Sequence, residues 1–113
     1  MKISLGELTH ENKSDYIVSH FIKKEQQTDF SIVFVECITG HYKTKLKHAK
    51  RIYFILEGSG NFIIDETSYD AKQYDLFIIE SMSIYEYKGK MKMIEFNVPA
   101  TIVTGKQIGR AHV

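Results

Sequence analysis

The chain has 113 residues, of which 43% are hydrophobic and 26% charged, and its formal net charge is +1 at pH 7. This length allows one domain with a single core, and the balanced charge excludes the basic surplus that nucleic-acid binding needs. We find no apolar run that could span a membrane and no apolar signal-peptide core. We therefore expect no nucleic-acid or membrane partner and a cytoplasmic location. The single cysteine, Cys37, cannot form an internal disulfide and is expected to be a buried hydrophobe.

The first half of the chain predicts strands at residues 16–22 and 29–39, joined by a polar connection over residues 23–28. Residues 42–48 follow with period two. The less polar face of this strand is expected to point inward and carries Tyr42, Thr44, Leu46 and His48. The opposite face carries His41, Lys43, Lys45 and Lys47.

The central stretch, residues 51–65, is a β-branched and aromatic run, a Gly58-Ser59-Gly60 break and a second such run. We predict two short buried strands, 51–57 and 61–65, joined by a tight glycine turn. Further strands are predicted at residues 69–72, 76–79, 84–87 and 91–98, with a turn at 88–90, and Pro99 marks the end of the last strand. Many short strands without an amphipathic helix indicate an all-β fold, an antiparallel barrel or sandwich.

Residues 52–65 read Ile-Tyr-Phe-Ile-Leu-Glu-Gly-Ser-Gly-Asn-Phe-Ile-Ile-Asp, an order that resembles the first conserved block of the cupin superfamily. Residues 74–85 resemble the second block by shape only. The resemblance covers roughly residues 40–99 and implies a single small antiparallel β-barrel of the jelly-roll (cupin) type. We expect one domain over residues 1–104. Residues 107–113 resemble the translation of a sequencing adapter, so residues 105–113 are expected to be a non-native tail and the natural chain to continue.

Metal-dependent cupins hold their metal through a His-x-His pair, a Glu and a later His. The resemblance places Arg51 in the Glu column and Tyr85 in the later His column. Depending on loop spacing, the His-x-His columns hold Thr44 and Leu46, or Lys45 and Lys47. None of these is a usual ligand for a divalent metal, and Arg51 would oppose a cation. We therefore expect no metal and no cofactor.

The lysines of residues 43–47 are expected to form a solvated face. The alternative is that Lys45 and Lys47 turn inward beside Arg51, which would create a cationic pocket that requires an anionic ligand. A lone inward His48 is more typical of a hydrogen-bonded structural residue than of a metal ligand.

The resemblance turns Arg51, Tyr53 and Tyr85 toward the barrel cavity, and the period-two face adds Thr44 and His48. Arg51 offers paired donors for an anion, and the tyrosines offer flat faces with a hydroxyl tip. The expected ligand is a small polar or anionic molecule, such as a sugar derivative or a carboxylate. The alternative is that Arg51 pairs with an internal carboxylate, Glu95 being a candidate, and the tyrosines fill the barrel.

Two functions remain open at this point. The first is a metal-free binding domain that serves as a sensor or carrier. The second, implied by cupin-like epimerases that use a His base and a Tyr acid, is a metal-free isomerase or epimerase of sugar-like substrates, with His48 and Tyr85 in those roles.

A homodimer is expected because Ile52, Phe54 and Leu56 make the predicted strand apolar on the face away from the cavity. Alternatively, residues 16–22 cover that face.

Overall fold

The computed structural model describes residues 2–22 and 29–100. These residues form a short 3-10 helix and eight strands, and the last strand stops just before Pro99, as predicted. In chain order they are η1 (Leu5–Glu7), β1 (His10–Asn12), β2 (Tyr16–Ile22), β3 (Ser31–Cys37), β4 (Gly40–Lys45), β5 (Lys50–Ile64), β6 (Thr67–Lys72), β7 (Leu76–Ile79) and β8 (Ile84–Val98). The polar connection predicted at residues 23–28 and the tail predicted at residues 105–113 lie outside the described residues. Neither η1 nor β1 was predicted from the sequence.

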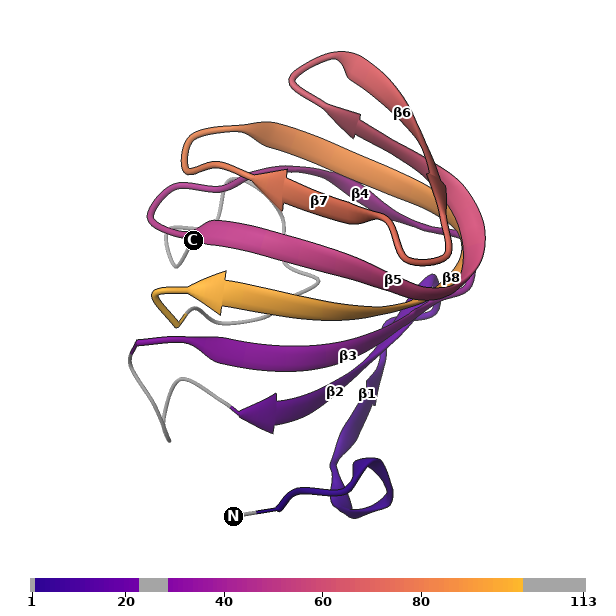
Figure 1. Ribbon diagram of the computed structural model, residues 1–113, viewed down its shortest axis with the longest axis vertical. Helices are drawn as coiled ribbons and strands as arrows, with labels where there is room; N and C mark the ends of the chain where they lie inside the picture. The colour runs from indigo at the N-terminus through magenta and orange to yellow at the C-terminus, as the bar shows by residue number, and fades with distance from the viewer. Residues whose placement is uncertain (1, 23–28, 101–113) are drawn as a thin grey trace.

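The strands are antiparallel and hydrogen-bond in the order β1-β2-β3-β8-β5-β6, with β4 added beside β8 and β7 added beside β5. The two longest strands pair with each other along their whole length. The first half of β5 also pairs with β7 and its second half with β6. The first half of β8 also pairs with β4 and its second half with β3. Figure 1 shows the resulting two layers, which meet where β5 and β8 curve. The predicted all-β jelly-roll barrel is confirmed, although the hydrogen-bonded sheet does not close.

Glycines at the crossing of β5 and β8 allow both strands to bend. Gly58 has a φ of 91°, and a Cβ added there would lie 2.1 Å from the carbonyl oxygen of Lys90. Gly60 lies opposite Gly89, whose φ is 123°. Only glycine adopts such angles without strain and permits such close backbone contact.

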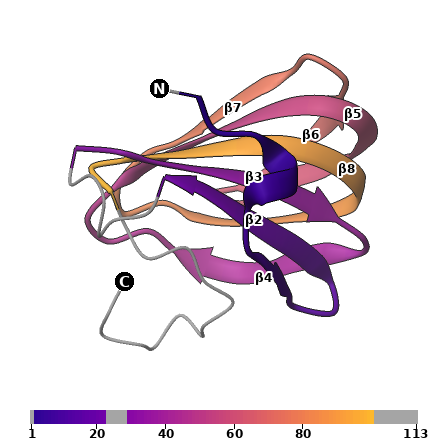
Figure 2. The same ribbon diagram turned by 90° about the horizontal axis from the view of Figure 1, so that it is seen from below.

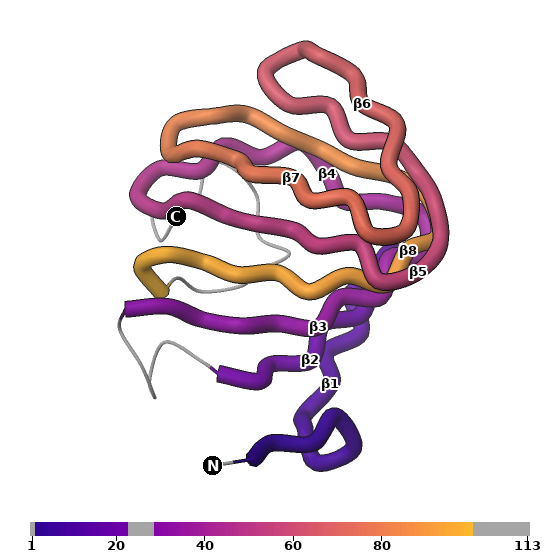
Figure 3. The backbone as a smooth tube through the Cα atoms, viewed as in Figure 1, coloured from indigo at the N-terminus to yellow at the C-terminus, as the bar shows by residue number. Residues whose placement is uncertain are grey.

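The predicted glycine turn at residues 58–60 is therefore wrong, and so is the turn predicted at residues 88–90. Both segments lie within continuous strands of 15 residues each. The smooth backbone of Figure 3 shows both strands bending at the same side of the molecule. A strand bend and a hairpin turn both require glycine, and in both the glycine interrupts the run of β-branched residues. The sequence alone therefore does not distinguish a bend within a strand from a turn between two strands.

The core lies between the two layers and is filled by the inward residues of β3, β5 and β8. Val33, Val35, Ile55 and Met93 are 1% exposed or less. Cys37 is buried as expected, and burial raises the pKa of its thiol to about 12, so the group remains a protonated thiol at neutral pH. The interior also contains polar side chains, and these form the site described below.

The outer face of the β3-β8-β5-β7 layer carries two apolar rows. The register aligns Ile32, Phe96, Ile52 and Ile78 in one row and Phe34, Ile94, Phe54 and Leu76 in the other. Strand β2 does not cover these rows, because it pairs edge to edge with β3. The alternative that residues 16–22 cover this face is therefore wrong, since they extend the same sheet.

The N-terminal segment lies at the end of the molecule opposite β6 (Figures 1 and 2). Its Ile3 lines an apolar hollow of about 360 Å³ together with residues of β2, β3 and β8: Phe21, Ile22, Ile32 and Ile94. Over residues 2–22 and 29–100, no helix has both the length and the apolar character needed to cross a membrane. The cytoplasmic location stays a prediction.

Candidate functional site

Polar side chains occupy inward positions on three neighbouring strands. The register places Asn97 of β8 between Ser31 of β3 and Arg51 of β5. Two residues farther along the pairing of β5 and β8, Glu95 lies opposite Tyr53. These residues alternate with the outward apolar rows, so the same period-two pattern that builds the sheet directs them into the interior. All five are buried.

Arg51 is 6% exposed, and protein groups satisfy much of its guanidinium. Its Nε donates a hydrogen bond to Oδ1 of Asn97 at 2.6 Å, and its Nη1 donates to the hydroxyl of Tyr85 at 2.7 Å. The Nε also lies 3.6 Å from Oε2 of Glu95, which is 3% exposed. Burial alone would lower the pKa of Arg51, but the Glu95 carboxylate raises it well above its ordinary value. Arg51 therefore remains charged and is paired.

Asn97 connects the members of this cluster and is fully buried. Its amide nitrogen donates to Oε2 of Glu95 at 3.0 Å and to the hydroxyl of Ser31 at 3.2 Å, while its carbonyl oxygen accepts the bond from Arg51. The amide orientation is consistent with all three partners. The alternative in which Arg51 pairs with Glu95 is the arrangement that the structure contains.

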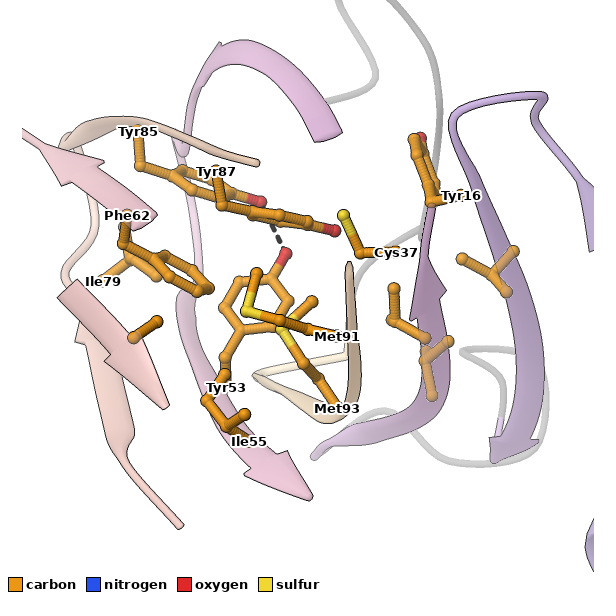
Figure 4. Close-up of a cluster of buried hydrophobic side chains, with 14 of the residues drawn as sticks. Tyr16, Cys37, Tyr53, Ile55, Phe62, Ile79, Tyr85, Tyr87, Met91 and Met93 are labelled. Carbon is orange, nitrogen blue, oxygen red and sulfur yellow. Dashed lines mark hydrogen bonds between the residues drawn. The ribbon is translucent and has the colours of Figure 1, made fainter. Parts of the chain in front are cut away.

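Three tyrosines extend the cluster toward β4. The hydroxyls of Tyr53 and Tyr85 lie 2.8 Å apart and hydrogen-bond to each other. Figure 4 shows these two hydroxyls and that of Tyr87 directed toward the same region of the interior. Burial raises the pKa values of Tyr53 and Tyr87 well above the ordinary tyrosine value. Burial also raises the pKa of Tyr85, and the Arg51 guanidinium opposes this rise.

His41 on β4 lies among tyrosine rings. Its ring centroid is 5.6 Å from that of Tyr85, at an interplanar angle of 12°, and 5.2 Å from that of Tyr87. The rings of Tyr16 and Tyr42 are 5.1 and 4.5 Å away. The Nδ1 of His41 lies 2.7 Å from the Tyr42 carbonyl oxygen, which can only accept, so Nδ1 carries a proton. In the neutral ring, Nε2 is then the basic nitrogen.

Of the residues predicted for the site, the structure brings Thr44, Arg51, Tyr53 and Tyr85 together inside the barrel. Thr44 is buried on β4 opposite Tyr85. The expected inward orientation of His48 is wrong. Strand β4 ends at Lys45, and His48 is exposed in the turn that leads to β5.

The sequence prediction also placed His41 on the outward face, and this is wrong too. The β4–β8 pairing shifts register between His41 and Thr44, so an extra residue enters β4 and both side chains are buried. A bulge of this kind breaks strict period two, and nothing in the sequence marks it. Lys43 and Lys47 are exposed and Lys45 is half-buried, so these lysines do not form the cationic pocket considered above.

Sequence reasoning missed Asn97, Ser31 and Tyr87 as site residues. A signal for Asn97 was present, because residues 91–97 alternate Met, Lys, Met, Ile, Glu, Phe, Asn. That pattern puts Glu95 and Asn97 on the face of the two methionines. The register that joins this face to Arg51 could not be read from one sequence.

The interior does not fit a divalent metal. Of the two spacings that the resemblance allows, the structure buries Thr44 and Leu46 rather than Lys45 and Lys47, so the implied ligand columns hold Thr44, Leu46, Arg51 and Tyr85. The Arg51 guanidinium occupies this space as a paired cation, and a second positive charge beside it would be repelled. Within the described residues, no three His, Cys, Asp or Glu side chains are grouped in a way that could hold a metal ion. The absence of a cofactor stays a prediction.

Fold and site together define a small jelly-roll domain of the cupin type with a buried polar interior. No protein-family model and no curated protein matches the chain. Among solved structures, Pac13 from Streptomyces, described as a unique nucleoside dehydratase, matches at a TM-score of 0.82 and 20% identity over 90% of this chain and 84% of its own. Three further matches are Pac13 variants with uridine, in which a tyrosine is replaced by phenylalanine (two variants) or a histidine by glutamine.

Two other matches have different described roles. Ectoine synthase from P. lautus matches at a TM-score of 0.80 and 13% identity, over 93% of this chain and 80% of its own. The cupin domain of Schizosaccharomyces pombe Cnp3 matches at 0.75 and 19% identity, over 88% and 74%. At these identities the likeness establishes the fold alone. The cupin-type fold implied by the resemblance is confirmed, and a shared fold does not determine function.

Proposed function

We propose that this domain binds a small polar molecule in the barrel interior, without a metal, at the groups presented by His41, Tyr53, Tyr85 and the Arg51–Glu95 pair. The observation that carries the proposal is the concentration of buried polar and titratable groups on inward positions of β4, β5 and β8. Burying such groups costs free energy that an apolar core would not, and clusters of this kind mark functional sites. A sensor or a carrier needs nothing beyond such a site.

A second candidate function is metal-free proton transfer, as in an isomerase, epimerase or lyase. Two observations favour it: the basic Nε2 of His41 belongs to a ring stacked beside Tyr85, and Tyr85 accepts a hydrogen bond from a guanidinium. A histidine base and a tyrosine acid form a reasonable proton-transfer pair. His41 takes the role that the sequence analysis gave to His48. Pac13 supports this candidate by analogy, because its structures with uridine include variants of one histidine and two tyrosines.

Binding and catalysis are tested with the same variants. Uridine and galactose serve as probes, and calorimetry measures their binding to the wild-type chain. His41→Gln is expected to weaken binding at least tenfold, whereas His48→Gln, which changes an exposed histidine, is expected to have no effect. Incorporation of deuterium from D2O at a carbon of the probe, lost in His41→Gln, would favour the enzyme. Equal binding by both variants would contradict the proposed site.

We also propose that the chain forms a homodimer through the outer apolar rows of the β3-β8-β5-β7 layer. The rows remain uncovered at the β7 end, where Leu76 is 55% and Ile78 48% exposed. A second copy would bury this patch, and symmetric pairing of one face with itself is the common solution. Ile78→Lys is expected to give a monomer by light scattering, whereas Ile84→Lys, at an exposed isoleucine of the other layer, should stay dimeric. A monomeric wild type at high concentration would contradict the dimer.

A further inference from the structure

We infer that the interior site takes an uncharged, hydroxyl-rich ligand and discriminates against its phosphorylated or carboxylated counterpart. This inference rests on the proposed function and restricts the ligand class. It departs from the expectation that Arg51 anchors an anion. The reason is that the protein already compensates the charge of Arg51 and uses two of its three guanidinium nitrogens.

The charges on the inner face compensate one another. Arg51 and Glu95 form one buried pair of opposite charge, 3.6 Å apart. Toward β1 and β2, the Glu11 carboxylate is bound by His20 at 2.6 Å and by Lys13 at 3.2 Å. The β4 lysines do not add a buried cation, because Lys43 and Lys47 are exposed and Lys45 is half-buried. Within the described residues, the interior therefore presents no uncompensated positive charge to an anion.

The hydrogen bonds that Arg51 already makes disfavour an anionic ligand. A carboxylate or phosphate gains most from two parallel N–H donors at one edge of the guanidinium. Here Nε donates to Asn97 and Nη1 donates to Tyr85, so an anion at either edge would have to share a nitrogen that already donates to a protein group. An anion that displaced Asn97 from Nε would also compete with Glu95, whose Oε2 lies 3.6 Å from the same nitrogen. That exchange would leave a buried carboxylate without its cation, which is strongly unfavourable.

The remaining polar atoms suit hydroxyl groups. The carboxylate of Glu95 accepts hydrogen bonds only, whereas the hydroxyls of Tyr53 and Tyr85 both donate and accept. A ligand hydroxyl can donate to Glu95 and accept from a tyrosine, while a phosphate dianion can only accept and would face the Glu95 charge. The rings of Phe62 and Tyr87, 4.9 Å apart, pack in the apolar cluster beside these groups and would border a bound sugar or base ring.

Matched pairs of probes test the inference: uridine against uridine 5′-monophosphate, and galactose against galacturonate. In the wild-type chain, calorimetry is expected to show the uncharged member binding at least tenfold more tightly. Glu95→Gln keeps the shape of the side chain and leaves Arg51 uncompensated, so the preference should shift toward the anionic member by at least tenfold. Glu57→Gln removes an equal charge from an exposed side chain that pairs with Lys92, and it should leave the ratio unchanged.

The double variant Arg51→Gln/Glu95→Gln removes both charges and keeps the inference testable if Glu95→Gln is poorly folded. It should retain the preference for the uncharged members. Tighter binding of the anionic members by the wild type would overturn this inference and leave the proposed binding function standing. A wild type that binds no member of either pair would contradict the proposed function as well.

Discussion

Removal of the Arg51 guanidinium should lower the stability of the fold strongly, and the variant Arg51→Met measures this loss. Methionine keeps much of the side-chain volume and removes the guanidinium. Glu95, 3% exposed, would then lose its cation, and Asn97, fully buried, would lose a donor. Removing one partner of a buried ion pair costs about 3–5 kcal/mol. At about 4 °C per kcal/mol for a domain of this size, the melting temperature should fall by about 12–20 °C.

The assay is thermal and urea unfolding followed by circular dichroism, with Lys92→Met as the control. Lys92 also pairs with a glutamate, Glu57, at 3.9 Å, but the two side chains are 48% and 69% exposed. Exposed pairs contribute about 0–1 kcal/mol, so Lys92→Met should be nearly neutral. Adding Glu95→Gln to Arg51→Met should recover at least about 1 kcal/mol, because the unpaired buried charge disappears. If Arg51→Met costs no more than Lys92→Met, the buried network does not hold the interior together.

Three further predictions concern the framework around the site. Gly58→Ala should lower the free energy of unfolding by at least about 2 kcal/mol, because φ is 91° and the new Cβ would meet the Lys90 carbonyl. Gly6→Ala, where an added Cβ has nothing within 4 Å, should leave the free energy of unfolding unchanged, and similar urea midpoints for the two variants would contradict the bend. Cys37, with a thiol pKa of about 12, should resist alkylation by iodoacetamide at pH 8 until the chain is unfolded, and rapid labelling of the native protein would contradict its burial. Above about pH 10 the unfolded chain ionises its tyrosines while the native chain keeps Tyr53 protonated, so the free energy of unfolding should fall as the pH rises. Tyr53→Phe should reduce the slope of the free energy of unfolding against pH by about 1.4 kcal/mol per pH unit. An unchanged slope would contradict the raised pKa of Tyr53.

The strand content could be predicted from the sequence wherever one face is apolar and the segment is short. The predictions for residues 16–22 and 76–79 coincide with β2 and β7. The two longest strands could not be predicted, because Gly58 and Gly89 interrupt the pattern of β-branched and aromatic residues. Whether such a glycine ends a strand or bends it depends on the strand lying against it, here the Lys90 carbonyl and the backbone of Gly60. That contact is tertiary, and a local pattern does not contain it.

In the candidate site too, some residues could be predicted from the local pattern and others could not. Arg51 and Tyr53 could be predicted because they lie at alternate positions of one strand with a recognisable order of residues. Glu95 could be suggested as a partner because it is a carboxylate within an otherwise apolar alternation. His41 and His48 were given opposite orientations from those observed, since a bulge after His41 and the end of β4 at Lys45 both break the period. A side chain's direction follows from period two only while the strand is regular.

The bend and the site are connected through the strands that carry both. Strand β5 places Arg51 in one half and Phe62 in the other, and β8 places Tyr85 in one half and Glu95 in the other. Because each strand passes through the bend, two chain segments supply polar groups from both layers of the barrel. The register of β5 against β8 fixes where these groups meet, and it is held by backbone pairs from Lys50 to Ile64. A substitution at the bend should therefore alter the 2.7 Å distance between Nη1 of Arg51 and the hydroxyl oxygen of Tyr85, although neither residue is substituted. The glycines thus act on the binding site as well as on the fold, and Gly58→Ala should weaken ligand binding more than its cost in stability alone would explain.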